Sequence, residues 1–239
     1  MKTQLLTVLL ALSLSSCAIQ PPIQFDDESY SRGVADEGVN SSGPSFVDYD
    51  NDGDMDIYVS TEYHGDNQGN RLFENNGNGE FIDVAVKRGV DNKGGLGRGA
   101  SWGDYDNDGD MDVVISNMPP SDRSTHVPTS LYKNLLIETG SPNFENASRE
   151  ANLFRKNFPN DQEIGGIGNT GAGVAWADFD NDGDLDLYWK CAEYDIDNAL
   201  FRNNGDGTFT DITEESGTGI LEMVTEANSQ GSPNWTDVN

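Results

Sequence analysis

The stretch Phe46–Ile57 reads FVDYDNDGDMDI, and nearly the same residues occur twice more along the chain. The second copy, WGDYDNDGDMDV, starts at Trp102, and the third, WADFDNDGDLDL, starts at Trp176. The copies are therefore offset by 56 and then by 74 residues. An acidic motif that recurs in register at such intervals is typical of a chain built from structural repeats of one kind.

Each repeat predicts about four short strands. One strand precedes the acidic motif, one follows it, and two form a glycine-rich hairpin, so that Arg71–Gly79 resembles Leu200–Gly207. In the second repeat a longer excursion, Leu135–Asn143, replaces the tight turn. Strands such as Val113–Ser116 are apolar on both alternating faces, which indicates a sheet that is buried on two sides. We therefore predict an all-β fold, a partial β-propeller of about three four-stranded blades.

The two ends of the chain extend the repeat pattern. Residues 25–34 share Phe, Arg, Gly and Val with residues 81–90 at the same positions, so the mature N-terminus is expected to begin with the last strand of a repeat. Such a strand would close a ring against the C-terminal blade. Trp235–Asn239 matches Trp176–Asp180, which predicts the start of a fourth acidic motif at Asp237. Because a ring needs roughly four to eight blades, we interpret the sequence as a fragment; the alternative is a divergent terminal cap.

The composition is strongly acidic. The chain has 42 acidic and 14 basic residues, for a net charge of −28. Such an excess destabilises a compact chain unless counter-ions bind, and it argues against nucleic acid as a partner. Disorder is the alternative for an acidic chain of low hydropathy, but 4 Trp, 8 Tyr and 10 Phe residues favour a packed core.

The acidic motifs are predicted to bind calcium. Aspartates stand at positions 1, 3, 5, 7 and 9, counted from the first Asp of each motif. Like charges about 4 Å apart repel by roughly 4 kcal/mol near a protein surface, so a bound cation is expected. Oxygen ligands at these positions, with glycine at position 6, are the pattern of the Ca²⁺-binding EF-hand loop. We predict about three Ca²⁺ sites with these ligands: Asp48, Asp50, Asp52, Asp54 and Asp56; Asp104, Asp106, Asp108, Asp110 and Asp112; Asp178, Asp180, Asp182, Asp184 and Asp186.

An EF-hand itself is excluded, because the flanks read as strands. In addition, its bidentate glutamate at position 12 would fall on Val59, Ile115 and Trp189. We expect the aspartate at position 9 to close each site instead, and position 7 to bind through its backbone carbonyl. Zinc is disfavoured, since His64 and His126 lie outside the motifs.

These units resemble a known repeat family. A strand–DxDxDGDxD–strand unit followed by an N-N-G-x-G-x-F hairpin, as in Asn75–Phe81, is similar to the FG-GAP/VCBS repeats of integrin-type propellers. The nearest kind precedes ASPIC/UnbV domains in bacterial surface and secreted proteins. The literal Phe-Gly and Gly-Ala-Pro signatures are absent, and Trp102-Gly103 and Trp176-Ala177 stand in their place. The resemblance therefore implies the propeller fold and leaves integrin-like ligand binding unsupported.

The N-terminus predicts export. Met1-Lys2 precedes an apolar segment, Leu5–Leu14, that is too short to span a bilayer stably. Leu14–Cys17 resembles a bacterial lipobox, which implies a signal peptide at 1–16, acylation of Cys17, a tether at 17–24 and the propeller at 25–239. Ala18 then favours an outer-membrane lipoprotein; an ordinary secretory signal is the alternative. With Cys17 acylated, a disulfide to Cys191 is not expected.

No catalytic constellation stands out, so we expect a non-enzymatic surface module that binds calcium and an extracellular protein or glycan. The membrane would be reached only through the lipid anchor. The alternative is a calcium-dependent polysaccharide lyase, or the propeller portion of a larger secreted hydrolase. Asn117–Thr129 and Arg155–Gly168 are the inserts expected to contact a partner, because loops carry function on a rigid scaffold.

Overall fold

The computed structural model describes most of the repeat region. It covers residues 25–35, 40–63, 69–118, 127–156, 160–168, 171–191 and 198–219. Several sequence predictions therefore lie outside the described residues, namely the signal peptide at 1–16, Cys17 with the tether at 17–24, His64, His126 and the fourth motif at Asp237.

Each repeat folds into one four-stranded antiparallel sheet, and the strands of each sheet follow one another in chain order. We call these sheets the first, second and third blades. The first contains β1 (Asn40–Val47), β2 (Asp56–Tyr63), β3 (Arg71–Asn75) and β4 (Phe81–Asp83). The second contains β5 (Leu96–Gly103), β6 (Asp112–Met118), β7 (Ser130–Asn134) and β8 (Phe144–Asn146). The third contains β9 (Gly171–Ala177), β10 (Asp186–Cys191), β11 (Ala199–Asn203) and β12 (Phe209–Asp211).

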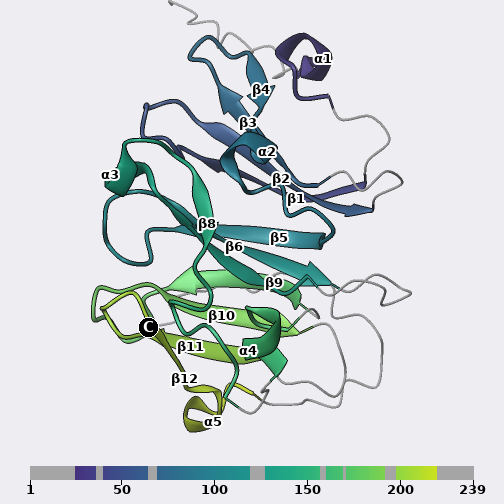
Figure 1. Ribbon diagram of the computed structural model, residues 1–239. Coiled ribbons are helices and arrows are strands. Elements are labelled where there is room, and N and C mark those ends of the chain that lie inside the picture. Colours follow the sequence, from purple (N-terminus) through teal and green to yellow (C-terminus); the bar gives the residue numbers. More distant parts are fainter. Residues whose placement is uncertain are drawn as a thin grey trace, which may run out of the picture.

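The predicted all-β fold and the strand count of each repeat are confirmed. Figure 1 shows the three blades stacked one upon another, with the second between the first and the third. β5 lies against β1 and β2 on one side and against β9 on the other. The described blades form part of a propeller and do not close into a ring.

Two apolar clusters fill the spaces between the blades. β6 contributes to both, because Val113 and Ile115 belong to the cluster shared with the first blade and Val114 to the cluster shared with the third. This alternation confirms that a central blade is buried on both faces. The fully buried large side chains of these clusters include Tyr58, Leu72, Leu131, Leu187, Trp189 and Phe201.

The tryptophan that precedes the second acidic motif and the one that precedes the third each pack on the preceding blade. Trp102 Nε1 donates a hydrogen bond of 3.0 Å to Ser45 Oγ, and Trp176 Nε1 donates one of 3.0 Å to the Ser101 oxygen. Phe46 holds this position in the first blade and is 67% exposed, because the described chain places no blade before the first. Trp102 and Trp176 thus act in blade packing.

The helices are short connectors. They are α1 (Ser29–Arg32), α2 (Ala85–Arg88), α3 (Leu136–Thr139), α4 (Asn160–Ile164) and α5 (Thr213–Ser216). Among the described residues, no helix has the length and apolar content needed to cross a bilayer.

The N-terminal segment corrects one prediction. Residues 25–28 form no strand, although they repeat the pattern of residues 81–84. A strand needs a neighbour to pair with, and the described chain offers none to this segment. Only the second half of the pattern has the same structure in both places: a short helix is followed by a C-cap glycine, Gly33 after α1 and Gly89 after α2.

α1 nevertheless packs on the first blade as α2 packs on the second. A Cβ added to Gly33 would lie 2.6 Å from the Phe81 oxygen, and one added to Gly89 would lie 2.9 Å from the Phe144 oxygen. Arg32 also donates a hydrogen bond of 3.3 Å to the Gly79 oxygen. The N-terminal segment therefore takes the place that the end of a preceding blade would take.

Candidate metal centre

The three acidic loops, which we call the first (48–56), second (104–112) and third (178–186), share one conformation. The aspartate at position 1 accepts hydrogen bonds from the amides at positions 5 and 6, at 3.0–3.1 Å in all three. Positive φ angles at positions 4 and 6 let the chain fold around this carboxylate, and asparagine and glycine are the residues that adopt them most readily. These residues are Asn51, Asn107 and Asn181, and Gly53, Gly109 and Gly183.

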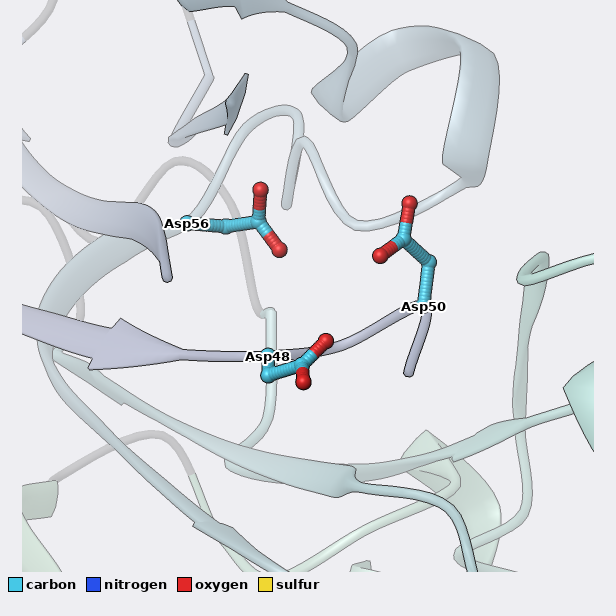
Figure 2. A group of neighbouring side chains, drawn as sticks. All are labelled: Asp48, Asp50 and Asp56. Atoms are coloured by element: carbon cyan, nitrogen blue, oxygen red, sulfur yellow. The ribbon is translucent and has the colours of Figure 1, made fainter. Parts of the chain in front are cut away.

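The fold brings several predicted ligands together. In the first loop, carboxylate oxygens of Asp48, Asp50 and Asp56 lie within 4.8 Å of one another, and Figure 2 shows the three carboxylates directed toward a common space. The same positions 1, 3 and 9 converge in the third loop, in Asp178, Asp180 and Asp186. In the second loop positions 1, 3 and 5 converge instead: Asp104, Asp106 and Asp108.

Positions 5 and 7 stand outside these groups in the first and third loops. The Asp52 carboxylate accepts a hydrogen bond of 2.9 Å from the Asp54 amide, and Asp182 accepts one of 3.0 Å from the Asp184 amide. Position 5 therefore helps to set the turn of the loop. Its other carboxylate oxygen remains able to bind a cation.

The aspartate at position 9 has a second role that the sequence did not reveal. Asp56 Oδ1 accepts a hydrogen bond of 2.7 Å from the Asn75 amide, and Asp56 Oδ2 accepts one of 3.4 Å from the Tyr49 amide. Asp112 and Asp186 accept the equivalent pairs at 2.8 and 3.2 Å and at 2.8 and 3.0 Å. This carboxylate therefore ties the loop to the third strand of its blade, whether or not it binds a cation.

The buried aspartates resist ionisation in the absence of a cation. Burial, with smaller contributions from neighbouring carboxylates, raises the pKa of Asp56 to about 7 and that of Asp112 to about 8. Burial also raises the pKa of Asp50 and of Asp104 above the ordinary value. A bound cation would favour the charged forms of these groups.

Two buried oxygens at position 3 fit such a cation. Asp50 Oδ1 and Asp106 Oδ1 are buried and make no hydrogen bond within the described residues. A buried carboxylate oxygen that lacks a partner is costly unless a charge or a donor satisfies it. The residues present therefore suit a hard cation with oxygen ligands.

The second loop differs from the other two in holding a lysine side chain. Lys133 Nζ forms ion pairs with Asp106, with Asp108 at 3.2 Å and with Glu138 at 2.5 Å. Glu138 comes from α3, and it forms a further carboxylate group with Asp108 and Asp110. Sequence reasoning identified the excursion that contains α3 and did not identify Lys133 or Glu138.

An asparagine at the end of the third strand joins the first and second acidic loops to the blade that follows each of them. Asn134 Nδ2 donates hydrogen bonds of 2.8 Å to the Tyr49 oxygen and of 3.3 Å to the Met111 oxygen. Asn203 Nδ2 repeats this arrangement, with 2.7 Å to the Tyr105 oxygen. In the sequence, only the recurrence of this asparagine at the same position of each repeat pointed to a structural role for it.

The loops also contact one another at the same end of the stack. Asn51 Nδ2 donates a hydrogen bond of 3.0 Å to the Gly109 oxygen, and Asn107 Nδ2 donates one of 2.7 Å to Asp184 Oδ1. Each acidic loop therefore supports the following one.

Comparison with known proteins supports the assignment of these units to a known type of repeat. The FG-GAP-like repeat matches residues 48–115, which contain the first and second acidic loops. Cartilage acidic protein 1 is 34% identical in mouse and 33% in human, over 46% of this chain and 16% of the relative. The Xenopus tropicalis protein of the same name is 27% identical over 71% of this chain and 26% of the relative. The chain thus matches about a quarter or less of each relative's length. Its residues 48–115 match the FG-GAP-like repeat, which is the family resemblance that the sequence predicted.

Proposed function

We propose that this chain is a calcium-binding β-propeller module of an exported protein, and that it acts by binding a partner rather than by catalysis. The geometry of the loops supports this proposal most strongly, because carboxylates converge in all three loops. In addition, Asp50 has a buried carboxylate oxygen that makes no hydrogen bond among the described residues. The proposed ligands are the fifteen aspartates at positions 1, 3, 5, 7 and 9.

The chemistry of the donors favours calcium over other metals. The converging groups in the described part of the chain consist of carboxylates alone. Zinc and copper sites include imidazole or thiolate ligands as a rule, whereas Ca²⁺ takes about six to eight oxygen ligands in flexible geometry. Mg²⁺ keeps more of its water and needs fewer protein ligands.

Calcium would act on stability. The loops connect β1 to β2, β5 to β6 and β9 to β10, so a cation in each would fix one strand connection of each blade. If free Ca²⁺ exceeds the Kd tenfold, each site adds about 1.4 kcal/mol, and three sites add about 4 kcal/mol. Extracellular modules of this sort bind Ca²⁺ with a Kd of about 10⁻⁴–10⁻³ M, so calcium would stabilise the folded module outside the cell.

The proposed setting is the cell envelope or the extracellular space. It rests on the signal-like N-terminus, on Cys17 in a lipobox-like sequence and on the net charge of −28. The matched relatives carry the name cartilage acidic protein 1, and the present chain shares the acidic character that this name states. An outer-membrane lipid anchor at Cys17 is part of the proposal.

The proposed partner is an extracellular protein or a glycan, held by the two inserts. Their described ends meet, since Thr129 pairs with Ile167 and the Thr129 amide donates a hydrogen bond of 3.3 Å to the Gly168 oxygen. Within the second insert, Arg155 forms a buried ion pair with Asp161 at 2.7 Å and lies over the Trp189 ring. This gives the inserts a rigid base on the third blade.

Calorimetric titration of the full chain with Ca²⁺ and with Mg²⁺ tests the proposal. We expect saturable binding of about three Ca²⁺ ions, with much weaker binding of Mg²⁺. Absence of bound Ca²⁺ in equilibrium dialysis at about 10 mM, well above the expected Kd, would contradict the proposal.

A further inference from the structure

The second acidic loop already contains a positive charge. The Lys133 side chain is 20% exposed, and its ammonium lies among Asp106, Asp108 and Glu138. Asp106 and Asp108, at positions 3 and 5, are 13% and 18% exposed. Two of the proposed calcium ligands are therefore engaged by a cation of the chain itself.

The other blades place different side chains at this position. Lys133 directly precedes Asn134, and Glu74 and Arg202 directly precede the equivalent asparagines. The Glu74 carboxylate is bound by Arg88 at 2.7 Å and by the Tyr49 hydroxyl, and Arg202 is exposed. Within the described residues, the second loop is thus distinct from the first and third.

The excursion that replaces the tight turn brings further groups to the second loop. α3 places Glu138 Oε1 2.5 Å from Lys133 Nζ, and the Ile137 amide donates a hydrogen bond of 3.0 Å to Asp110 Oδ2. Asp110 is 1% exposed, and its Oδ1 makes no hydrogen bond within the described residues.

In the first and third loops glycines occupy the corresponding space. A Cβ on Gly77 would lie 2.9 Å from Asp54 Oδ2, and one on Gly205 would lie 2.7 Å from Asp184 Oδ2. A tight turn therefore leaves no room there for a side chain. In the second repeat, the excursion with α3 replaces the tight turn that the other two repeats have beside their acidic loops, and Lys133 accompanies this replacement.

We infer that Lys133 is a built-in cation of the second loop and competes with calcium for Asp106 and Asp108. This inference rests on the proposed calcium binding. An ammonium and Ca²⁺ repel each other and cannot share the same two carboxylates at contact distance. Calcium must displace Lys133, so the second loop binds calcium more weakly than the first and third and keeps its shape when calcium is scarce.

A calcium titration of three full-length proteins tests this inference. They are the wild type, Lys133→Gln and the matched control Arg202→Gln, which removes the same charge from an exposed side chain at the same strand position. We expect the wild type to show two tighter sites and one weaker site. Lys133→Gln should tighten the weaker site by about tenfold or more, since relief of one partly buried repulsion exceeds about 1.4 kcal/mol. Arg202→Gln should leave all sites unchanged.

A measurement on the wild type covers the case in which Lys133→Gln fails to fold. Reductive methylation followed by peptide mass spectrometry reports how accessible each lysine amine is. Lys133 should be protected in chelator and should become reactive when calcium fills the weaker site. Lys156, whose side chain is 56% exposed, should react equally in both conditions and serves as the internal control.

The outcomes separate the two proposals. Three equivalent sites in the wild type that Lys133→Gln leaves unchanged, or a Lys133 amine that reacts alike with and without calcium, would overturn the inference while calcium binding stands. No calcium binding in any of the three proteins would overturn the calcium proposal, and the inference with it.

Discussion

The side-chain amide of Asn134 donates a hydrogen bond of 2.8 Å to the main-chain oxygen of Tyr49, across the boundary between the second and first blades. Asn203 donates the equivalent bond of 2.7 Å to Tyr105 between the third and second blades. Tyr49 and Tyr105 stand at position 2 of the first and second loops. The asparagines of the second and third blades therefore each hold the acidic loop of the blade before, so blade stacking supports the first and second candidate metal sites.

Asn134→Ala should lower the free energy of unfolding by about 1–3 kcal/mol. The substitution leaves the Tyr49 oxygen without its donor at a position where Asn134 is fully buried. Urea denaturation measures the loss. Asn40→Ala, at an exposed position of β1 whose side chain makes no hydrogen bond among the described residues, is the control and should change stability by less than about 0.5 kcal/mol. Equal losses in the two variants would show that the blade-to-blade hydrogen bond contributes nothing.

Asp50→Asn should have opposite effects with and without calcium. In chelator it removes a half-buried charge that partial burial and the neighbouring carboxylates of Asp52 and Asp48 disfavour, so the melting temperature should stay the same or rise. In calcium it removes a ligand, so the first loop should bind more weakly and the calcium-dependent gain in melting temperature should shrink. Glu145→Gln makes the same charge change on the exposed edge of the second blade and should leave the gain intact. An undiminished gain in Asp50→Asn would argue that Asp50 is no ligand.

Gly33→Ala should release the N-terminal segment from the first blade. Gly33 has a φ of +82°, and an added Cβ would lie 2.6 Å from the Phe81 oxygen. Gly217→Ala is a matched control, because Gly217 has a φ of +69° and nothing lies within 4 Å of its Cβ position. Both variants carry the backbone strain, and only the first carries the clash. Limited proteolysis should cut near α1 faster in Gly33→Ala than in Gly217→Ala. Identical cleavage would contradict the docking of α1.

The binding role can be separated from the enzymatic alternative. Incubated with acidic polysaccharides and calcium, the full chain should release no unsaturated sugars, and in a glycan or protein array it should bind without turnover. Appearance of unsaturated products, followed by their ultraviolet absorbance, would favour a lyase and refute the non-enzymatic proposal.

The sequence predicted what is local to a repeat. The loop conformation depends on Asn and Gly at positions 4 and 6, and the strands follow from the apolar residues that flank each motif, so the four strands of each blade were found. The contacts that cross between blades or between distant strands were not found. Asn134 reaches a neighbouring blade, and Lys133 reaches the second loop only because β7 lies beside β6. The prediction of a strand at residues 25–28 was wrong for the same reason. A strand forms only where a neighbouring strand pairs with it, and a local sequence pattern does not show whether that neighbour is present.

Thermal unfolding of the full chain with calcium and with chelator tests the central claim most directly. At calcium about ten times the Kd of the two tighter sites, these sites and the weaker second site together contribute about 3–4 kcal/mol. For a chain of this size each kcal/mol shifts the melting temperature by about 2–4 °C, so chelation should lower it by about 6–16 °C, and calcium in excess should restore it. A melting temperature that is the same in calcium and in chelator would contradict the account of the acidic loops as structural calcium sites.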